Sequence, residues 1–324
     1  MKPDWSREGV LAEIGTYSAE IVAPTGSQVE RYCRYYEIDF AKKMPQTSHR
    51  IGWTDVLGYK VVVQSFLKEN SRGTVVVLHG YFDHVGLYRH LIRYLLEHNY
   101  SVVCYDQPGH GLSSGPLAAI KSFEEYQAVL QRVLSLAEPL MPRPWYAVGQ
   151  STGGAVLIDH LLFAPRKGKV TPFSHVALLA PLIRPMGWQA GKLLHAMMQP
   201  FVKTWKRAFS ENSSDQMFVK FIREHDPLQS RIMGVDWISS LKRWVPRVEA
   251  ADAVANEVTI IQGKLDLTVD WRHNVKVIQE KFPNSSLLKL PFGRHHMVNE
   301  SEDIRFEAFS AIGQAFEMAA SQPE

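Results

Sequence analysis

The stretch WYAVGQSTGGAVLIDHLLF, Trp145 to Phe163, joins two hydrophobic patterns across a turn rich in small residues. Its apolar run ends at Val148 and is typical of a buried strand, whereas the residues after the turn repeat with helical spacing. Between them stands Gly149-x-Ser151-x-Gly153, the pattern of a nucleophile elbow. The flanking glycines are needed because a Cβ at either position would collide with the neighbouring strand or helix. The stretch therefore predicts a strand, a sharp turn that lifts the Ser151 hydroxyl clear of a sheet, and a helix.

The same turn predicts where negative charge could be stabilised. The amide of Thr152 stands at the expected helix N-terminus, where its N–H and the helix dipole favour a developing oxyanion. A second donor is expected from the amide of Tyr81, in the loop that follows the apolar run at residues 74–78. His79, at the start of that loop, is interpreted as a residue that braces it.

Apolar runs before and after the elbow alternate with amphipathic segments. The runs expected to form strands span residues 74–78, 101–105, 145–148, 175–179, 258–262 and 286–290. Helical spacing separates several of them, as at residues 87–100 and 122–137. Two further short strands are expected as a hairpin around Gly58. This order predicts an α/β fold with a mostly parallel central sheet flanked by helices and with the reactive groups at the carboxyl ends of its strands.

Interruptions of this alternation predict how the chain is divided. Residues 1–50 are expected to form an N-terminal extension packed on the core, with a helix at 29–41 and a polar loop at 42–50. The α/β core is expected over 51–181 and 251–324. Between these parts, residues 182–250 carry no convincing strand pattern, and we expect a helical cap inserted at the end of the sheet where the nucleophile lies.

An apolar stripe in the expected cap has two interpretations. Its large side chains recur at spacings of three to four and are interrupted by lysines and an arginine. An ordinary amphipathic helix resting on the core would have this pattern. A substrate pocket or a membrane-facing surface for acyl chains would have it too, because methionine and tryptophan adapt to irregular apolar ligands. Under the second interpretation the pocket residues are Trp188, Leu194, Met197, Met198 and Phe201.

A serine hydroxyl needs a base to take its proton and a carboxylate to orient that base. Asp266 follows the expected strand at 258–262 and is the predicted acid, with Asp270 as the alternative. His295 follows the last expected strand and is the predicted base, with His296 as the alternative because spacing alone does not separate the two. Each group thus follows a strand of the same predicted sheet.

Composition limits the class of protein. The chain has 324 residues, of which 45% are hydrophobic and 21% charged, with a net charge of +3. This suits one globular α/β domain with an insertion, and it disfavours nucleic acid as a partner while allowing transient contact with an anionic membrane surface. Cys33 and Cys104 indicate neither a disulfide framework nor a zinc site, and no metal or organic cofactor is expected. Without a signal-peptide pattern or a membrane-spanning run, a cytoplasmic protein is expected.

Five motifs resemble those of the α/β-hydrolase superfamily, and within it the monoacylglycerol lipase, lysophospholipase and serine aminopeptidase-like group. They are LHGYFDHVGLYRHL at 78–91, YDQPGHGLSSG at 105–115, GQSTGG at 149–154, GKLDLTV at 263–269 and GRHHMVNE at 293–300. The resemblance implies His295 as the base, since the group's histidine precedes a glutamate by five residues, here Glu300. It also implies Asp266 as the acid. Gln150 and Thr152 depart from the group, which commonly has His and Met at these positions.

The resemblance and the residues together predict a serine hydrolase that cleaves a carboxylic ester, with a small ester or a lipid such as a monoacylglycerol or lysophospholipid as substrate. The alternative is an aminopeptidase-type enzyme with the same triad, for which an acidic cluster in the cap is expected to hold the substrate amine. A third hypothesis is a non-catalytic binding protein on a hydrolase scaffold. The presence of all three triad residues disfavours it.

Overall fold

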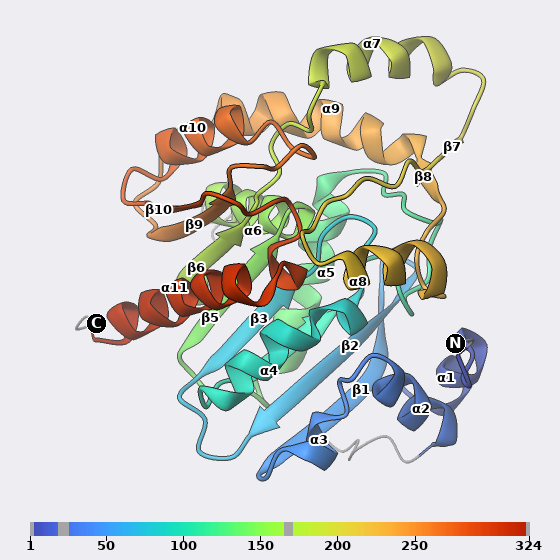
Figure 1. The fold of residues 1–324 in the computed structure, drawn as a ribbon, viewed down its shortest axis with the longest axis vertical. Coiled ribbons are helices and arrows are strands. Elements are labelled where there is room, and N and C mark those ends of the chain that lie inside the picture. The colour runs from blue at the N-terminus through green and yellow to red at the C-terminus, as the bar shows by residue number, and fades with distance from the viewer. Residues whose placement is uncertain (1–2, 19–25, 165–170, 322–324) are drawn as a thin grey trace.

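The computed structural model describes residues 3–18, 26–164 and 171–321. An eight-stranded sheet runs through the centre in the order β1-β2-β4-β3-β5-β6-β9-β10 (Figure 1). β1 pairs antiparallel with β2 and β2 antiparallel with β4, whereas every other neighbouring pair is parallel. The predicted α/β architecture with a mostly parallel sheet is thus confirmed.

The strands of this sheet are β1 Thr47–Val56, β2 Tyr59–Lys68, β3 Thr74–Leu78, β4 Ser101–Tyr105, β5 Trp145–Gln150, β6 Phe173–Leu179, β9 Val258–Gly263 and β10 Ser286–Leu290. The helices along the sheet are α4 Arg89–Glu97, α5 Phe123–Ala137, α6 Thr152–Phe163, α9 Val235–Glu249, α10 Trp271–Lys281 and α11 Glu302–Ala320. The N-terminal helices are α1 Arg7–Glu13, α2 Ser27–Tyr35 and α3 Phe40–Lys43.

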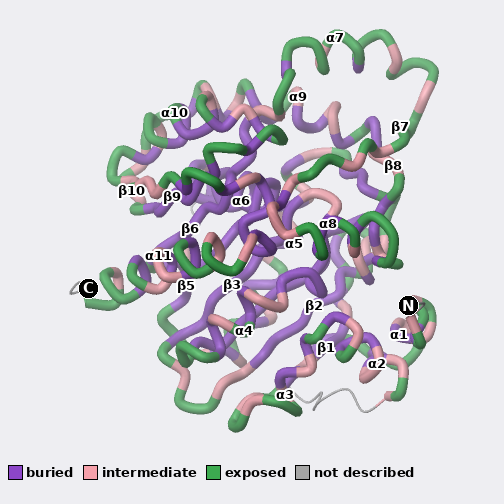
Figure 2. The backbone as a smooth tube through the Cα atoms, viewed as in Figure 1, coloured by how far each residue is buried: buried purple, intermediate pink, exposed green. Residues whose placement is uncertain are grey.

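Helices cover both faces of the sheet and create two apolar layers. One layer joins the sheet to α5, α6, α9 and α10, and the other joins it to α4, α11 and the N-terminal helices. Every residue of β3, β4 and β5 is therefore buried, which appears as a continuous buried core in Figure 2. Burial on both faces explains why these strands have unbroken apolar runs rather than alternating ones.

The N-terminal segment differs from its prediction in two places. The single helix expected at 29–41 is divided into α2 and α3, because Glu37 has a φ of +57° and cannot continue a right-handed helix. The loop expected at 42–50 is also wrong, since α3 continues to Lys43 and β1 begins at Thr47. Polar residues in β1 misled the prediction because part of that edge strand faces solvent.

Between β6 and β9 the chain leaves the sheet. It forms α7 Trp188–Met198, β7 Thr204–Lys206, α8 Gln216–Lys220, the π-helical turn Phe221–His225, β8 Ile232–Gly234 and then α9. The expectation that no strand occurs here was wrong, because β7 and β8 pair antiparallel in a separate two-stranded sheet. Three-residue strands are too short to leave a period-two pattern in the sequence.

Helix α7 stands apart from the rest of the molecule at the top of Figure 1 and is largely exposed in Figure 2. Trp188 is buried at its start, but Leu194, Met197 and Phe201 are 49%, 56% and 82% exposed. Most of the apolar stripe therefore does not rest on the core. Among the described residues, no helix is long and apolar enough to cross a membrane.

Candidate active site

Ser151 lies at the tip of the elbow between β5 and α6. Its backbone has φ +52° and ψ −111°, a conformation that is costly for a residue with a side chain and is held here by the surrounding strands. The amide of Ser151 donates to the carbonyl of Leu179 in β6, at 2.8 Å. A Cβ on Gly153 would lie 2.2 Å from the backbone oxygen of Leu78 in β3, so only glycine permits this packing.

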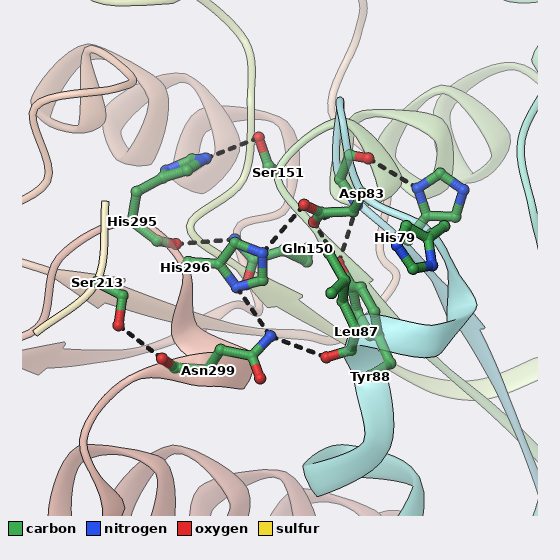
Figure 3. A network of polar contacts seen from close by, with 12 residues as sticks. His79, Asp83, Leu87, Tyr88, Gln150, Ser151, Ser213, His295, His296 and Asn299 are labelled. Carbon is green, nitrogen blue, oxygen red and sulfur yellow. Dashed lines mark hydrogen bonds and ion pairs between the residues drawn. The ribbon is translucent and has the colours of Figure 1, made fainter. Parts of the chain in front are cut away.

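His295 connects Ser151 to Asp266. Its Nε2 lies 3.0 Å from Oγ of Ser151, and its Nδ1 lies 2.8 Å from Oδ2 of Asp266. All three side chains are buried, and Figure 3 shows the His295 ring directed at the serine. The structure thus brings together the three residues predicted as nucleophile, base and acid, in a geometry suited to proton transfer from the hydroxyl.

The electrostatics of this pair favour an ionised acid beside a basic imidazole. Burial by itself would lower the pKa of His295, but the charge and hydrogen bond of Asp266 outweigh it and raise that pKa above its usual value. Burial likewise opposes ionisation of Asp266, yet His295 and further hydrogen bonds lower the pKa of the carboxyl. Its Oδ1 accepts from the amides of Thr268 and Val269, and Oδ2 accepts from Nε2 of Gln262. These donors hold Asp266 ionised and fix its orientation.

The loop that carries His295 is anchored from three directions. Nε2 of Gln150 donates to the carbonyl of His295 at 2.9 Å, so the residue before Ser151 also holds the histidine loop. The backbone carbonyl of Asn212 accepts from the amides of His295 and His296, at 3.0 and 2.8 Å. Buried Glu300 accepts from the amide of Arg294 at 2.6 Å. The glutamate five residues after His295 therefore has a structural role in the loop.

The two alternatives to the triad have other partners. Nε2 of His296 lies 3.0 Å from Oδ1 of Asp83, so its ring is bonded to that carboxylate rather than to Ser151 (Figure 3). Asp270 caps α10 by accepting from the amide of His273. Within the described part of the chain, neither side chain forms a hydrogen bond or ion pair with His295.

The loop after β3 is built around Asp83. Its Oδ2 accepts from the amide of Gly80 and from the hydroxyl of Tyr88. Burial opposes ionisation of Asp83, but His296 outweighs it, so the pKa of this carboxyl falls well below its usual range. His79 braces the same loop, since its Nδ1 donates to the carbonyl of Gly80 and its Nε2 accepts from the amide of Gln107. Burial lowers the pKa of His79 to about 3, which keeps it neutral.

The two residues predicted as oxyanion donors flank Ser151 in a pocket of about 220 Å³. Tyr81 is held there by its ring, which stacks on Trp237 at 3.9 Å between centroids, and by its hydroxyl, which donates to the carbonyl of Ala118. Thr152 is the first residue of α6, so its amide belongs to the unsatisfied helix N-terminus.

The pocket lining differs from the pocket predicted in the cap. Trp188, Leu194, Met197, Met198 and Phe201 do not line it. Its apolar wall includes Leu182, Pro185, Met233, Trp237 and Val269, and its polar wall includes Arg207, Ser210, Asn212 and Thr268. A larger hollow of about 700 Å³ lies at β9, β10 and α11 and includes no triad residue.

Several of these residues had no sequence signal. Asp83 lies inside the motif at 78–91, but its partner His296 is distant in sequence. Gln262 directly precedes the motif at 263–269, and only the fold shows its contact with Asp266 four residues on. Arg207 and Trp237 lie in the segment between β6 and β9, in which the sequence shows helical spacing but no sign of a pocket wall. His84, in the loop after β3, pairs with Asp226 at 3.0 Å. No cluster of three or more metal-ligating side chains occurs within residues 3–18, 26–164 and 171–321.

Comparison with known proteins gives consistent results. The family model described as "Serine aminopeptidase, S33" matches residues 69–302. The monoglyceride lipase of Mus musculus is 28% identical over 236 residues, covering 70% of this chain and 76% of the mouse protein. The Homo sapiens monoglyceride lipase is 27% identical, covering 71% and 77%. The crystal structure of a soluble variant of the Saccharomyces cerevisiae monoglyceride lipase superposes with a TM-score of 0.72 at 17% identity, covering 83% of this chain and 95% of that chain.

Proposed function

The chain belongs to the serine aminopeptidase S33 family of α/β-hydrolases and is a serine ester hydrolase, and from this premise we propose that it cleaves the ester bond of a monoacylated lipid through Ser151, His295 and Asp266. The observation that carries the proposal is the unbroken chain of contacts from Oγ of Ser151 through the His295 ring to Asp266.

In the proposed mechanism, Ser151 attacks the ester carbonyl while Nε2 of His295 takes the hydroxyl proton. Asp266 holds the imidazole and stabilises its charged form. The amides of Tyr81 and Thr152 donate to the carbonyl oxygen as it becomes negatively charged. His295 then gives its proton to the departing alcohol, and water, activated by the same histidine, releases the acid from the acyl-enzyme. All groups needed for these steps are side chains or amides of this chain.

A lipid substrate is supported by the names of the relatives and by the pocket. The mouse and human relatives are monoglyceride lipases. The wall formed by Leu182, Met233 and Val269 beside Ser151 is apolar and suits an acyl chain. We treat residues 182–250 as a cap over this wall, and the exposed apolar residues of α7 as a surface for transient contact with lipid.

A peptide substrate is the less favoured proposal. It would need carboxylates in the cap that face the nucleophile and bind an amine. Asp215 caps α8 and Asp226 pairs with His84, while Glu211 pairs with Arg294. None of these carboxylates lines the pocket.

Hydrolysis of matched substrates tests the proposal. The wild-type protein should release acid from p-nitrophenyl esters with a rate that rises from acetate to medium-length chains, and from a monoacylglycerol with the preferred chain. An aminoacyl p-nitroanilide should be cleaved at least a hundredfold more slowly, measured as kcat/KM. Faster cleavage of the anilide than of any ester would replace the lipid proposal with the peptidase.

A further inference from the structure

Arg207 places a positive charge in the wall of the Ser151 pocket. It follows β7 in the segment between β6 and β9, and it lines the same pocket as Ser151 and His295. Ester hydrolysis by the triad does not require this cation. A neutral acyl chain and a neutral glycerol would leave it without a partner of opposite charge.

Two aromatic rings and one set of hydrogen bonds hold the guanidinium in place. Its central carbon lies 4.0 Å from the ring centroid of Phe82 and 4.3 Å from that of Phe209. Nη1 donates to the side chain of Gln229 and to the carbonyl of Ser230. Nε and Nη2 have no hydrogen-bond acceptor among the described residues. The group is therefore positioned on one side and has donors available on the other.

The position of Phe82 is itself constrained. This residue directly follows Tyr81, and its φ of +69° lies in the left-handed region that an aromatic residue rarely adopts. Such strain persists only where the surrounding structure enforces it, and it occurs often at ligand sites. Here the strained residue contacts Arg207 beside the predicted oxyanion donor.

The carboxylates nearest to Arg207 are already used. Asp83 and Asp226 both act electrostatically on the guanidinium. However, Asp83 binds His296, the Gly80 amide and the Tyr88 hydroxyl, and Asp226 binds His84. Within the described part of the chain, no carboxylate lies within ion-pair distance of Arg207. Burial lowers the pKa of Arg207 to about 10, which leaves it charged at neutral pH.

Arg207 and Asn212 line the pocket from the same segment of chain, five positions apart. The segment from Arg207 to Asn212 passes over the histidine loop, because the carbonyl of Asn212 accepts from the His295 amide. His295 is the residue that protonates the leaving alcohol. In addition, Oδ1 of Asn212 is buried with no hydrogen-bond partner among the described residues, so it can accept from a hydroxyl of that alcohol.

We propose that Arg207 binds the phosphate of an acylated glycerophosphate, so that the preferred substrate is a lysophospholipid with an anionic head group rather than a neutral monoacylglycerol. This inference rests on the proposed function and specifies its substrate class. A guanidinium presents two parallel N–H groups to a phosphate, and Nε with Nη2 forms such a pair. The glycerol hydroxyl then faces Asn212.

The test compares two substrates with the same acyl chain, 1-lauroyl-glycerol and 1-lauroyl-glycerol-3-phosphate, below their critical micelle concentrations. Wild-type kcat/KM should be at least tenfold higher for the phosphate. Arg207→Gln should reduce the ratio of the two kcat/KM values by about 10- to 100-fold, the size expected for loss of a charged hydrogen-bonded pair. Arg207→Lys, which keeps the charge but loses the fork, should recover part of that ratio. A wild-type ratio of one or less would overturn the inference.

Arg231→Gln is the matched control. Arg231 also lies over the Phe209 ring, at 5.0 Å, but it is exposed and does not line the pocket. This variant should keep the wild-type ratio. An equal loss of the ratio in Arg231→Gln would show that surface charge, and not the pocket, attracts the phosphate, and would contradict the proposal.

Two further measurements separate the explanations. Labelling by an uncharged fluorophosphonate reports whether Ser151 is reactive in each variant. Labelling and ester turnover without a preference for the phosphate substrate would overturn the role of Arg207 and leave the esterase proposal standing. Absence of both labelling and turnover in the wild type would contradict the esterase proposal itself.

Glycerol 3-phosphate should inhibit the wild type more strongly than glycerol or inorganic phosphate. Equal inhibition by inorganic phosphate would indicate a site for a free anion and contradict head-group recognition.

Discussion

Nδ1 of His295 lies 2.8 Å from Oδ2 of Asp266, although the two residues are 29 positions apart and follow different strands. β9 and β10 are parallel neighbours, so the loops that follow them emerge at the same edge of the sheet. This arrangement makes the proposed acid a partner of the proposed base before any substrate is bound. The remaining donors to Asp266 keep it ionised and aligned.

The first prediction concerns this contact. Asp266→Asn should lower kcat by about 10⁴-fold, because the amide no longer holds the imidazole in the tautomer that accepts the serine proton. The base must be neutral to act, and Asp266 raises the pKa of His295. The acidic limb of the kcat/KM profile should therefore lie above about pH 6.5 in the wild type and move to lower pH in Asp266→Asn.

Asp270→Asn is the control for that experiment, since Asp270 caps α10 and does not contact His295. It should keep the acidic limb of the wild type and lose about 1 kcal/mol of stability at most. A shift of the limb in Asp270→Asn and none in Asp266→Asn would reverse the assignment.

The second prediction separates the adjacent histidines. His295→Ala should remove ester hydrolysis, whereas His296→Gln should lower kcat by no more than about tenfold. His296 acts through Asp83, which positions the Gly80 amide and not the serine. Rates of both variants on one ester decide the matter. A greater loss in His296→Gln than in His295→Ala would contradict the proposed base.

The third prediction tests the elbow. Gly153→Ala should destabilise the protein by several kcal/mol or prevent folding, because the added Cβ would lie 2.2 Å from the Leu78 oxygen. Gly191→Ala is the matched control, since a Cβ there would meet nothing within 4 Å and α7 should gain about 0.5–1 kcal/mol. Thermal unfolding of both variants measures the difference. Equal melting temperatures would show that the elbow tolerates a side chain.

Local patterns were sufficient to predict the sheet and the elbow. β3, β4 and β5 are buried on both faces, and such strands leave short, unbroken apolar runs that their length and flanking turn residues distinguish from helices. The Gly149-x-Ser151-x-Gly153 turn is recognisable in one short stretch because its small residues stand at fixed spacing, although the Leu78 oxygen that a Cβ on Gly153 would meet is distant in sequence. Candidate triad residues could be chosen from the loops after strands for the same reason. Parallel strands end at the same edge of a sheet, so the order of the expected strands already placed these loops near Ser151.

What could not be predicted depends on contacts between distant segments. Arg207 and Asn212 enter the pocket only because the segment between β6 and β9 crosses the histidine loop. The β7–β8 pairing joins three-residue strands separated by a long stretch of chain, and neither strand carries a pattern. The exposure of the α7 stripe was not predictable either, since an apolar helical face has the same spacing whether it meets a core or solvent.

The fourth prediction uses the buried pair of His84 and Asp226. Burial disfavours both charges, but their attraction raises the pKa of His84 and lowers that of Asp226. The stabilisation from His84 is fully present below about pH 6.5 and is lost as pH rises through its raised pKa. The stabilisation from Asp226 is fully present above about pH 4 and is lost as pH falls through the lowered pKa of this carboxyl. The pair therefore stabilises most between about pH 4 and 6.5.

His84→Gln should accordingly cost about 3 kcal/mol at about pH 5.5 and less at about pH 9. Denaturant unfolding at the two pH values measures this, with His98→Gln as the exposed control. A cost that is equal at both pH values would show that the charge of His84 does not contribute.

The most direct test of the account is the site of covalent labelling. Wild-type protein treated with a fluorophosphonate should gain the mass of a single adduct, located on Ser151 by peptide mapping, and should lose ester hydrolysis in proportion. Ser151→Ala should show neither adduct nor hydrolysis while unfolding at a similar temperature. Hydrolysis that persists in Ser151→Ala, or an adduct on another residue, would contradict the claim that Ser151 is the nucleophile.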